Sequence, residues 1–174
     1  MNITEVVQIL EKSEGYKEIA KWLTGTSKTL KIGGMQGSAP ALFLHAAQKA
    51  ANLPAVYILH DAEEAGYFFN DLCQLSAQGV YYFPSSYKKK IKDGLTKDAP
   101  NQVLRTEALN ALQGDAPVTL VTYPEALTEL VIAPQLLSKE TLHLQVGNSL
   151  STEYVVELLI EYGFEQTDFV YEPG

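Results

Sequence analysis

The alternation of short apolar runs with helical segments is the feature that most limits how this chain of 174 residues can fold. The runs suit strands because they are short and rich in β-branched and aromatic residues, whereas the segments between them carry apolar residues at helical spacing. Strict alternation favours a mostly parallel sheet with helices on both faces. We therefore predict a doubly wound α/β domain over residues 25–134. Its strands are predicted at 29–32, 55–59, 80–83 and 118–121, with helices at 39–51, 62–77 and 101–113.

The regions on either side of this domain follow different patterns. Residues 1–24 have the apolar spacing of two short amphipathic helices. After Pro134, a strand at 141–146, a helix at 152–162 and a strand at 164–171 are predicted. We interpret 135–174 as the beginning of a small α+β subdomain, and we expect it to continue beyond Gly174.

Charge and cysteine content exclude some classes of protein. The net charge of -8 and the sequence pI near 4.8 disfavour strong non-specific nucleic-acid binding by the chain as a whole. A single cysteine, Cys73, allows no internal disulfide, so a reducing compartment is the default. There is no signal-peptide pattern and no apolar run of membrane-spanning length, so a cytoplasmic protein is expected. No metal ligand set or cofactor is predicted.

A glycine-rich turn follows the first predicted strand and precedes a predicted helix, which is the order found in phosphate-binding loops. On the pattern G-x-x-x-x-G-K-[ST], Gly34 takes the first glycine position. Ala39, Pro40 and Ala41 then replace the second glycine, the lysine and the hydroxyl residue, so neither an ammonium group nor a Mg²⁺ ligand is present. The degenerate phosphate loop consists of Gly33, Gly34, Gly37, Ser38, Ala39, Pro40 and Ala41.

Two alternatives to a degenerate phosphate loop stay open. The glycines also suit a plain strand-to-helix turn, in which they allow close packing. The enzyme-class alternative is a nucleotide-binding domain in which backbone donors from Gly34–Ser38 replace the missing lysine. The nearest acidic residue after a predicted strand is Asp61, which is single and does not form a Walker-B pair.

His60 and Asp61 follow the strand at 55–59, at the end where open α/β sheets bind ligands. Asp61 and Glu64 also have the spacing of a capping box, in which each carboxylate accepts a backbone N–H at the start of a helix. We favour the capping role over a catalytic one. Thr122 and Glu125 show a second capping-box pattern, for a short helix to about residue 131.

One stretch of the chain, residues 85–99, is polar and basic. Lys88, Lys89, Lys90 and Lys92 form a phosphate-contacting loop on one interpretation and a solvated surface loop on the other. The acidic remainder of the chain favours the surface loop. A DNA-contacting module would show a steep salt dependence of duplex binding.

Five stretches in order resemble the N-terminal region of the bacterial transcription-repair-coupling factor family, Mfd, which is related to the excision repair protein UvrB. The stretches are GMQGSAPAL (34–42), AVYILHDAEEAGYFFNDL (55–72), YYFPSS (81–86), QVLRTEALNAL with VTLVTYPEAL (102–112 and 118–127), and LHLQVGNSLSTEYVVELLIEYGFEQTDFVYEPG (142–174).

The resemblance implies a UvrB-like ATPase fold with a degenerate phosphate loop and no catalytic residues in this region. It implies recruitment of the repair ATPase UvrA through contact residues expected beyond Gly174. RNA polymerase binding, DNA binding and an ATP-dependent motor are implied for other domains of the full-length protein. UvrB carries a long DNA-clamping hairpin after its third strand. The corresponding connection here, Pro84–Ala99, is short, and no damage-clamping hairpin is expected.

Overall fold

The computed structural model describes residues 3–26, 29–75, 79–90, 94–141, 146–147, 149, 151–161, 164 and 166–167. The chain divides into two compact units, Met1–Lys139 and Glu140–Gly174. The elements of the first unit are α1 (Ile3–Leu10), α2 (Glu14–Leu23), α3 (Ala39–Ala51), β1 (Ala55–Ile58), α4 (Ala62–Leu75), β2 (Val80–Phe83), β3 (Tyr87–Lys90), β4 (Gly94–Lys97), α5 (Ala99–Ala111), β5 (Thr119–Thr122), α6 (Pro124–Leu127) and α7 (Pro134–Glu140), whose last residue lies across the division. The helix α8 (Thr152–Glu161) lies in the second unit.

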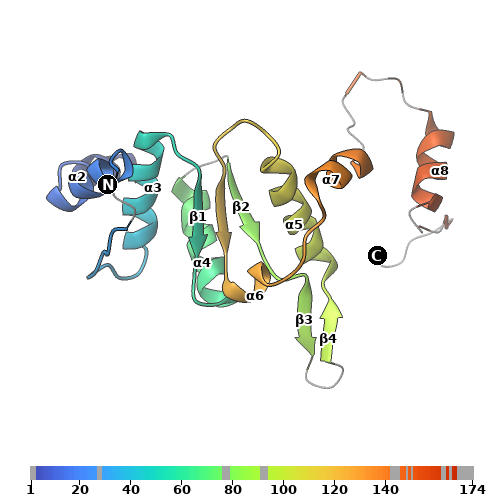
Figure 1. Ribbon diagram of the computed structural model, residues 1–174, viewed down its shortest axis with the longest axis horizontal. Coiled ribbons are helices and arrows are strands. Elements are labelled where there is room, and N and C mark those ends of the chain that lie inside the picture. Colours follow the sequence, from blue (N-terminus) through green and yellow to red (C-terminus); the bar gives the residue numbers. More distant parts are fainter. Residues whose placement is uncertain are drawn as a thin grey trace. The chain divides into compact units, whose positions relative to one another are not determined.

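The first unit is built around a parallel sheet of three strands in the order β1-β5-β2 (Figure 1). In register, Tyr57 of β1 is opposite Val121 of β5, which is opposite Tyr82 of β2. All four residues of the central strand β5 are buried, as expected for a parallel strand covered on both faces. A mixed α/β fold with a parallel sheet, predicted from the alternation of elements, is therefore present.

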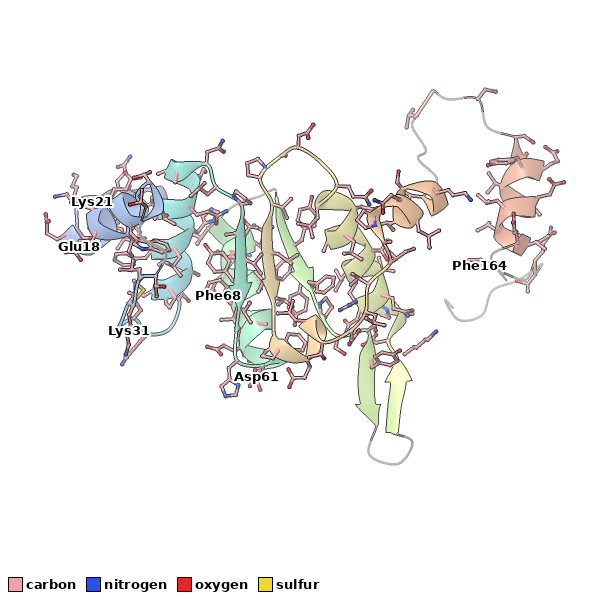
Figure 2. The ribbon with its side chains drawn as sticks, in the orientation of Figure 1. Glu18, Lys21, Lys31, Asp61, Phe68 and Phe164 are labelled. Atoms are coloured by element: carbon pink, nitrogen blue, oxygen red, sulfur yellow. The ribbon has the colours of Figure 1, made fainter. Side chains whose placement is uncertain are left out.

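Helices cover opposite faces of this sheet. On one face, the rings of Tyr57 and Phe68 of α4 lie 5.0 Å apart, and Phe69 of α4 stacks on Tyr82. Figure 2 shows Phe68 beside β1. Phe83, next to Tyr82 in β2, points to the other face because side chains alternate along a strand. There it meets Arg105 of α5.

The edge strand β1 is more exposed than its continuous apolar sequence predicts. The predicted sheet has helices on both faces, but Val56 and Ile58 are 55% and 58% exposed. These side chains lie on the same face of the sheet as α5. However, α5 packs against β2, which is the strand at the other edge of the sheet. Val56 and Ile58 therefore lack the cover that α5 gives to Phe83.

The strand predicted at 29–32 is absent, and this prediction was wrong. These residues form neither a strand nor a helix, and Leu30 and Ile32 are 38% and 40% exposed. A run of four residues is stable as a strand only when it pairs with a neighbour. The described part of the sheet contains three strands instead of the four predicted.

Helices α1 and α2 pack on α3 and form a second apolar cluster. Its buried members are Tyr16, Ile19, Ala46 and Ala47. Gln48 of α3 joins this layer to the sheet, because its side-chain amide donates to the Thr119 hydroxyl at 2.7 Å and to the Leu53 carbonyl at 2.9 Å. The Tyr57 hydroxyl donates to Gln48 Oε1 at 3.1 Å. The helix after the glycine loop is therefore attached to both β1 and β5.

The segment predicted as a basic loop forms a short antiparallel hairpin, β3–β4, and the loop prediction was wrong for these residues. Tyr87 pairs with Lys97 and Lys90 with Gly94. An Asp-Gly pair at 93–94 is a turn signal between strand-compatible residues, and the sequence interpretation gave it too little weight. Residues 91–93, which include Lys92, lie outside the described residues.

In the second unit, α8 begins as predicted. The Tyr154 N–H donates to the Ser151 hydroxyl at 3.3 Å, which makes Ser151 the N-terminal cap. The strands predicted at 141–146 and 164–171 lie largely outside the described residues. None of the helices in the described part of the chain is long and apolar enough to cross a membrane.

Candidate functional site

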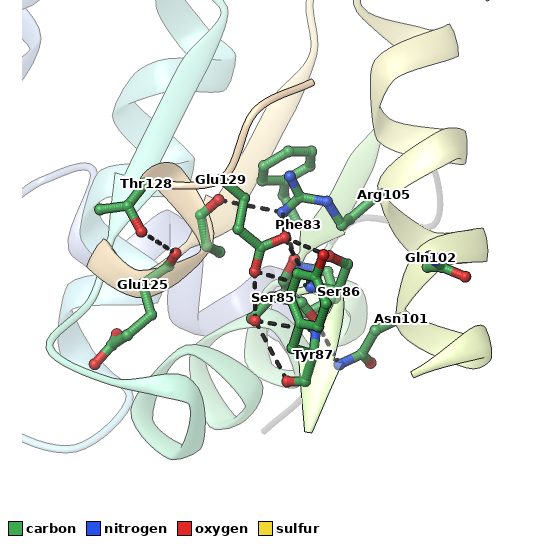
Figure 3. A network of polar contacts seen from close by, with 12 residues as sticks. Phe83, Ser85, Ser86, Tyr87, Asn101, Gln102, Arg105, Glu125, Thr128 and Glu129 are labelled. Carbon is green, nitrogen blue, oxygen red and sulfur yellow. Dashed lines mark hydrogen bonds and ion pairs between the residues drawn. The ribbon is translucent and has the colours of Figure 1, made fainter. Parts of the chain in front are cut away.

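A polar cluster lies where β2 and β5 end, at the carboxyl edge of the sheet, where open α/β proteins bind ligands (Figure 3). Its centre is the carboxylate of Glu129, two residues after α6. Both carboxylate oxygens accept the Ser86 N–H at 3.1 Å, and the Ser85 and Ser86 hydroxyls donate to them at 2.5 Å. Tyr123 accepts the Ser85 N–H at 2.8 Å through its hydroxyl.

Arg105 of α5 completes the cluster from the other side. It donates through Nη1 to the carbonyls of Pro84, at 2.7 Å, and of Ala126, at 3.2 Å. The same nitrogen lies 3.6 Å from Glu129 Oε2. Burial lowers the pKa of Arg105, while the nearby Glu129 carboxylate acts in the opposite direction. Arginine remains protonated in proteins, so this is a buried cation bound by two carbonyls and a carboxylate.

The pKa of Glu129 is lowered from its usual 4.5. Burial acts to raise it, but hydrogen bonds from Ser85 and Ser86 and the charge of Arg105 outweigh that effect. Glu129 is therefore held as an ionised acceptor. Because its donors come from the Pro84–Ser86 turn and from α5, the carboxylate joins three segments of the chain.

This cluster is suited to holding the backbone in place. Both carboxylate oxygens accept hydrogen bonds from the Pro84–Ser86 turn, and the guanidinium binds backbone carbonyls, so these groups fix the ends of β2 and α6. Among the described residues, no group of three or more His, Cys, Asp and Glu side chains could hold a metal ion. A cavity of about 400 Å³ beside the cluster is lined by Ser86, Arg105 and Leu130, among others.

The sequence interpretation did not single out Arg105 or Glu129. Arg105 lies three residues before Ala108, which is fully buried, so the spacing already placed a charged residue on the inward face of α5. A buried cation requires hydrogen-bond acceptors. The inward position of Arg105 therefore indicated that a polar cluster would surround it. Nothing in the sequence near Glu129 indicates that it would meet Ser85 and Ser86, which are more than forty positions away.

The glycine loop, residues 33–38, contains two glycines with positive φ, but no strand precedes it at 29–32. Gly34 and Gly37 have φ values of 81° and 57°, which favour glycine. Gly33, Gly34, Gly37 and Ser38 are exposed, Ala39 and Pro40 are partly buried, and Ala41 is fully buried in the core. Ala41, which the sequence pattern aligns with the hydroxyl residue of a phosphate loop, therefore faces the protein interior.

A cavity of about 220 Å³ lies beside this loop. Its wall includes Ser38 and Ala41 from the start of α3 and Asp71 from α4. A carboxylate in this wall repels a phosphate group. The local chemistry therefore disfavours an anion next to the loop.

The capping box at the start of α4 is confirmed, and the one at α6 is not. Asp61 accepts the Glu64 N–H at 2.8 Å, and Glu64 accepts the His60 N–H at 3.0 Å. Figure 2 shows Asp61 at the carboxyl end of β1. Tyr123, instead of Thr122, is the N-cap of α6, without a side-chain capping bond. The Thr122 hydroxyl donates to the Phe83 carbonyl at 2.8 Å, because Thr122 is fully buried between strands.

The described residues form an α/β protein with a parallel sheet. At the carboxyl edge of that sheet, the polar cluster connects the ends of β2 and α6 to α5. Along 169 residues, the chain is 26% identical to the transcription-repair-coupling factor of Bacillus subtilis (strain 168). That match covers 95% of this chain and 14% of the Bacillus protein, so the chain is similar to one region of a much longer protein. No family model matches the chain.

Proposed function

We propose that this chain is a non-catalytic, UvrB-like scaffold region of a transcription-coupled DNA repair factor. In this role it supports the recruitment of UvrA to RNA polymerase stalled at DNA damage. The observation that carries the proposal is the extent of the similarity, because 95% of the chain aligns with the Bacillus transcription-repair-coupling factor. The proposal extends to three parts: N-terminal helices at 1–24, a degenerate P-loop-like domain at 25–134, and the beginning of a UvrA-docking-type subdomain at 135–174.

The geometry of the glycine loop supports a role without catalysis by this region. Ala41 is buried, Pro40 supplies no backbone N–H, and Asp71 lines the neighbouring cavity. ATP hydrolysis, RNA polymerase binding and the main DNA contacts would then belong to other parts of the full-length protein. Within such a protein, this region supports the UvrA-docking subdomain.

A chimera tests the repair function directly. The 174-residue chain would replace the matched region of the Bacillus transcription-repair-coupling factor, and strand-specific repair of ultraviolet lesions would be measured in cells that lack the native factor. We expect preferential repair of the transcribed strand to be restored. A chimera that accumulates and displaces stalled RNA polymerase but does not bind UvrA or restore this preference contradicts the proposal. The native Bacillus factor and a chimera without the segment are the controls.

Calorimetric titration with Mg-ATP tests the absence of nucleotide binding. We expect no heat of binding for the 174-residue chain. A dissociation constant in the micromolar range, about -8 kcal/mol, would instead support the nucleotide-binding alternative with a variant loop. The double variant Pro40→Lys and Ala41→Thr is the comparison, because it restores the two missing side chains of the pattern.

A further inference from the structure

Positive charge is concentrated in one element of an acidic chain. Five of the lysines, Lys88, Lys89, Lys90, Lys92 and Lys97, lie within ten consecutive positions, whereas the net charge of the chain is -8. Asp93 is the single acidic residue among those ten. The rest of the chain is correspondingly more acidic, so the charge distribution is strongly asymmetric.

The hairpin β3–β4 gives four of these lysines a defined backbone, and Lys92 lies outside the described residues. Lys88 is opposite Thr96 and Lys89 is opposite Leu95. Lys88 and Lys90 lie two positions apart in β3, and Lys97 lies in the paired strand β4. Two positions along a strand span about 7 Å, a spacing similar to that of successive phosphates along a nucleic-acid strand. Figure 1 shows that the hairpin extends away from the three-stranded sheet.

The base of the hairpin is fixed by the polar cluster at Glu129. Ser85 and Ser86, which precede β3, are held by that carboxylate. On the returning strand, the Asp98 N–H donates to the Ser86 carbonyl at 2.8 Å. Asn101 of α5 donates to the Ser85 carbonyl at 2.9 Å. Both ends of the ribbon are therefore attached to the first unit, and this attachment lowers the entropy lost when the hairpin binds a partner.

We propose that the hairpin β3–β4 binds the phosphate backbone of duplex DNA without reading base sequence, with Glu129 as the positioning residue of the hairpin. Lysines concentrated in a protruding ribbon can neutralise phosphates and release their counterions. Tyr87, 41% exposed at the base, adds an aromatic surface beside the lysines. The acidic remainder of the chain limits contact to the hairpin itself. This inference does not depend on the proposed repair function.

Fluorescence anisotropy with a labelled 20-base-pair duplex of mixed sequence tests the proposal on the 174-residue chain. We expect non-specific affinity in the range of about 10⁻⁴ to 10⁻⁶ M, with log K falling against log salt with a slope of about -3 for three or four phosphate contacts. The variant Lys88→Gln, Lys89→Gln and Lys90→Gln should lose most of this slope and at least about tenfold in affinity at low salt. The matched control is Lys12→Gln, Lys21→Gln and Lys139→Gln, in which three exposed lysines outside the hairpin are neutralised. Equal losses in the two variants would overturn the proposal.

A polyglutamate peptide distinguishes DNA from an acidic protein partner. Binding of the peptide as tight as that of the duplex, at equal salt, would overturn the assignment to nucleic acid. Absence of duplex binding at 50 mM salt would overturn the proposal as a whole.

The variant Glu129→Ala tests positioning separately from charge. Removing a carboxylate makes the chain less acidic, so simple electrostatics predicts tighter duplex binding. Loss of the anchor predicts weaker binding and faster amide hydrogen exchange in β3, with circular dichroism confirming that the helices remain folded. Tighter binding with unchanged exchange would show that Glu129 does not position the hairpin.

Discussion

The guanidinium carbon of Arg105 lies 4.0 Å from the centre of the Phe83 ring, so a buried cation covers the end of an edge strand. The same side chain binds the carbonyls of Pro84 and Ala126 and faces Glu129. We expect Arg105→Leu to lower the free energy of unfolding by about 3 kcal/mol, because it leaves a partly buried carboxylate and two carbonyls without their donor. Urea unfolding monitored by circular dichroism measures the change.

Arg105→Lys is the matched control for this prediction. Lysine keeps the charge but cannot bind both carbonyls in the same planar geometry, so a loss of intermediate size is expected. If Arg105→Leu unfolds at the same urea concentration as the native chain, the cluster at the sheet edge does not contribute to stability.

Gln48 connects α3 to β1 and β5 through hydrogen bonds with Tyr57 and Thr119, and a third bond holds the Leu53 carbonyl in the loop after α3. We expect Gln48→Leu to cost about 2 kcal/mol, since the Thr119 hydroxyl and the Leu53 carbonyl both lose a donor. The exposed Gln113 provides the matched substitution, and Gln113→Leu should change stability by less than about 0.5 kcal/mol. Equal urea midpoints for the two variants would contradict the connecting role of Gln48.

Two valines in neighbouring strands should respond differently to the same substitution. Val121 of the central strand is fully buried, whereas Val56 of the edge strand is 55% exposed. We expect Val121→Ala to cost about 2 kcal/mol through lost burial and a cavity, and Val56→Ala to cost about 0.5 kcal/mol or less. Thermal or urea unfolding compares them. A loss at Val56 as large as that at Val121 would show that the exposed face of β1 is covered in solution.

His45 should make stability depend on pH near neutrality. It is buried in α3, and neither ring nitrogen has a hydrogen-bond partner among the described residues. Burial, together with the charge of Lys49, lowers the pKa of His45 below its usual 6.5. The unfolded chain therefore binds this proton more readily than the folded chain, so the stability due to neutral His45 is present above pH 6.5 and decreases as the pH falls below that value.

Urea midpoints at pH 7.5 and pH 5.5, for the native chain and for His45→Leu, measure this dependence. The native chain should lose stability at the lower pH, and the variant should lose less. The same decrease in both proteins would assign the effect to other groups. Glu129 acts in a separate window: because its folded pKa is lowered, its contribution is present above its usual 4.5 and is lost only at more acidic pH.

The elements that the sequence predicts well are those with strong local patterns. The runs AVYI, VYYF and TLVT form the strands of the sheet, and the helix at 39–51 has the predicted bounds. The Asp61–Glu64 capping box formed because both of its hydrogen bonds are local.

The features that the sequence does not reveal depend on distant partners. The run at 29–32 has the composition of a strand, but pairing decides whether a strand forms. Thr122 has the spacing of a cap, yet its hydroxyl bonds across the sheet to Phe83. Glu129 reaches Ser85 and Ser86 only because the end of β5 lies beside the end of β2. The degenerate phosphate loop stays a prediction from missing side chains, whereas the polar cluster required tertiary structure.

The position of β5 also determines the order in which the sheet can assemble during synthesis. It is the middle strand in space but the last of the three in the chain, and β1 and β2 pair with it and not with each other. While the ribosome is still producing α5, both outer strands exist without a partner, and only local helices and the hairpin can form. The emergence of residues 119–122 then closes two long loops at once, so sheet formation is a late and cooperative step of folding.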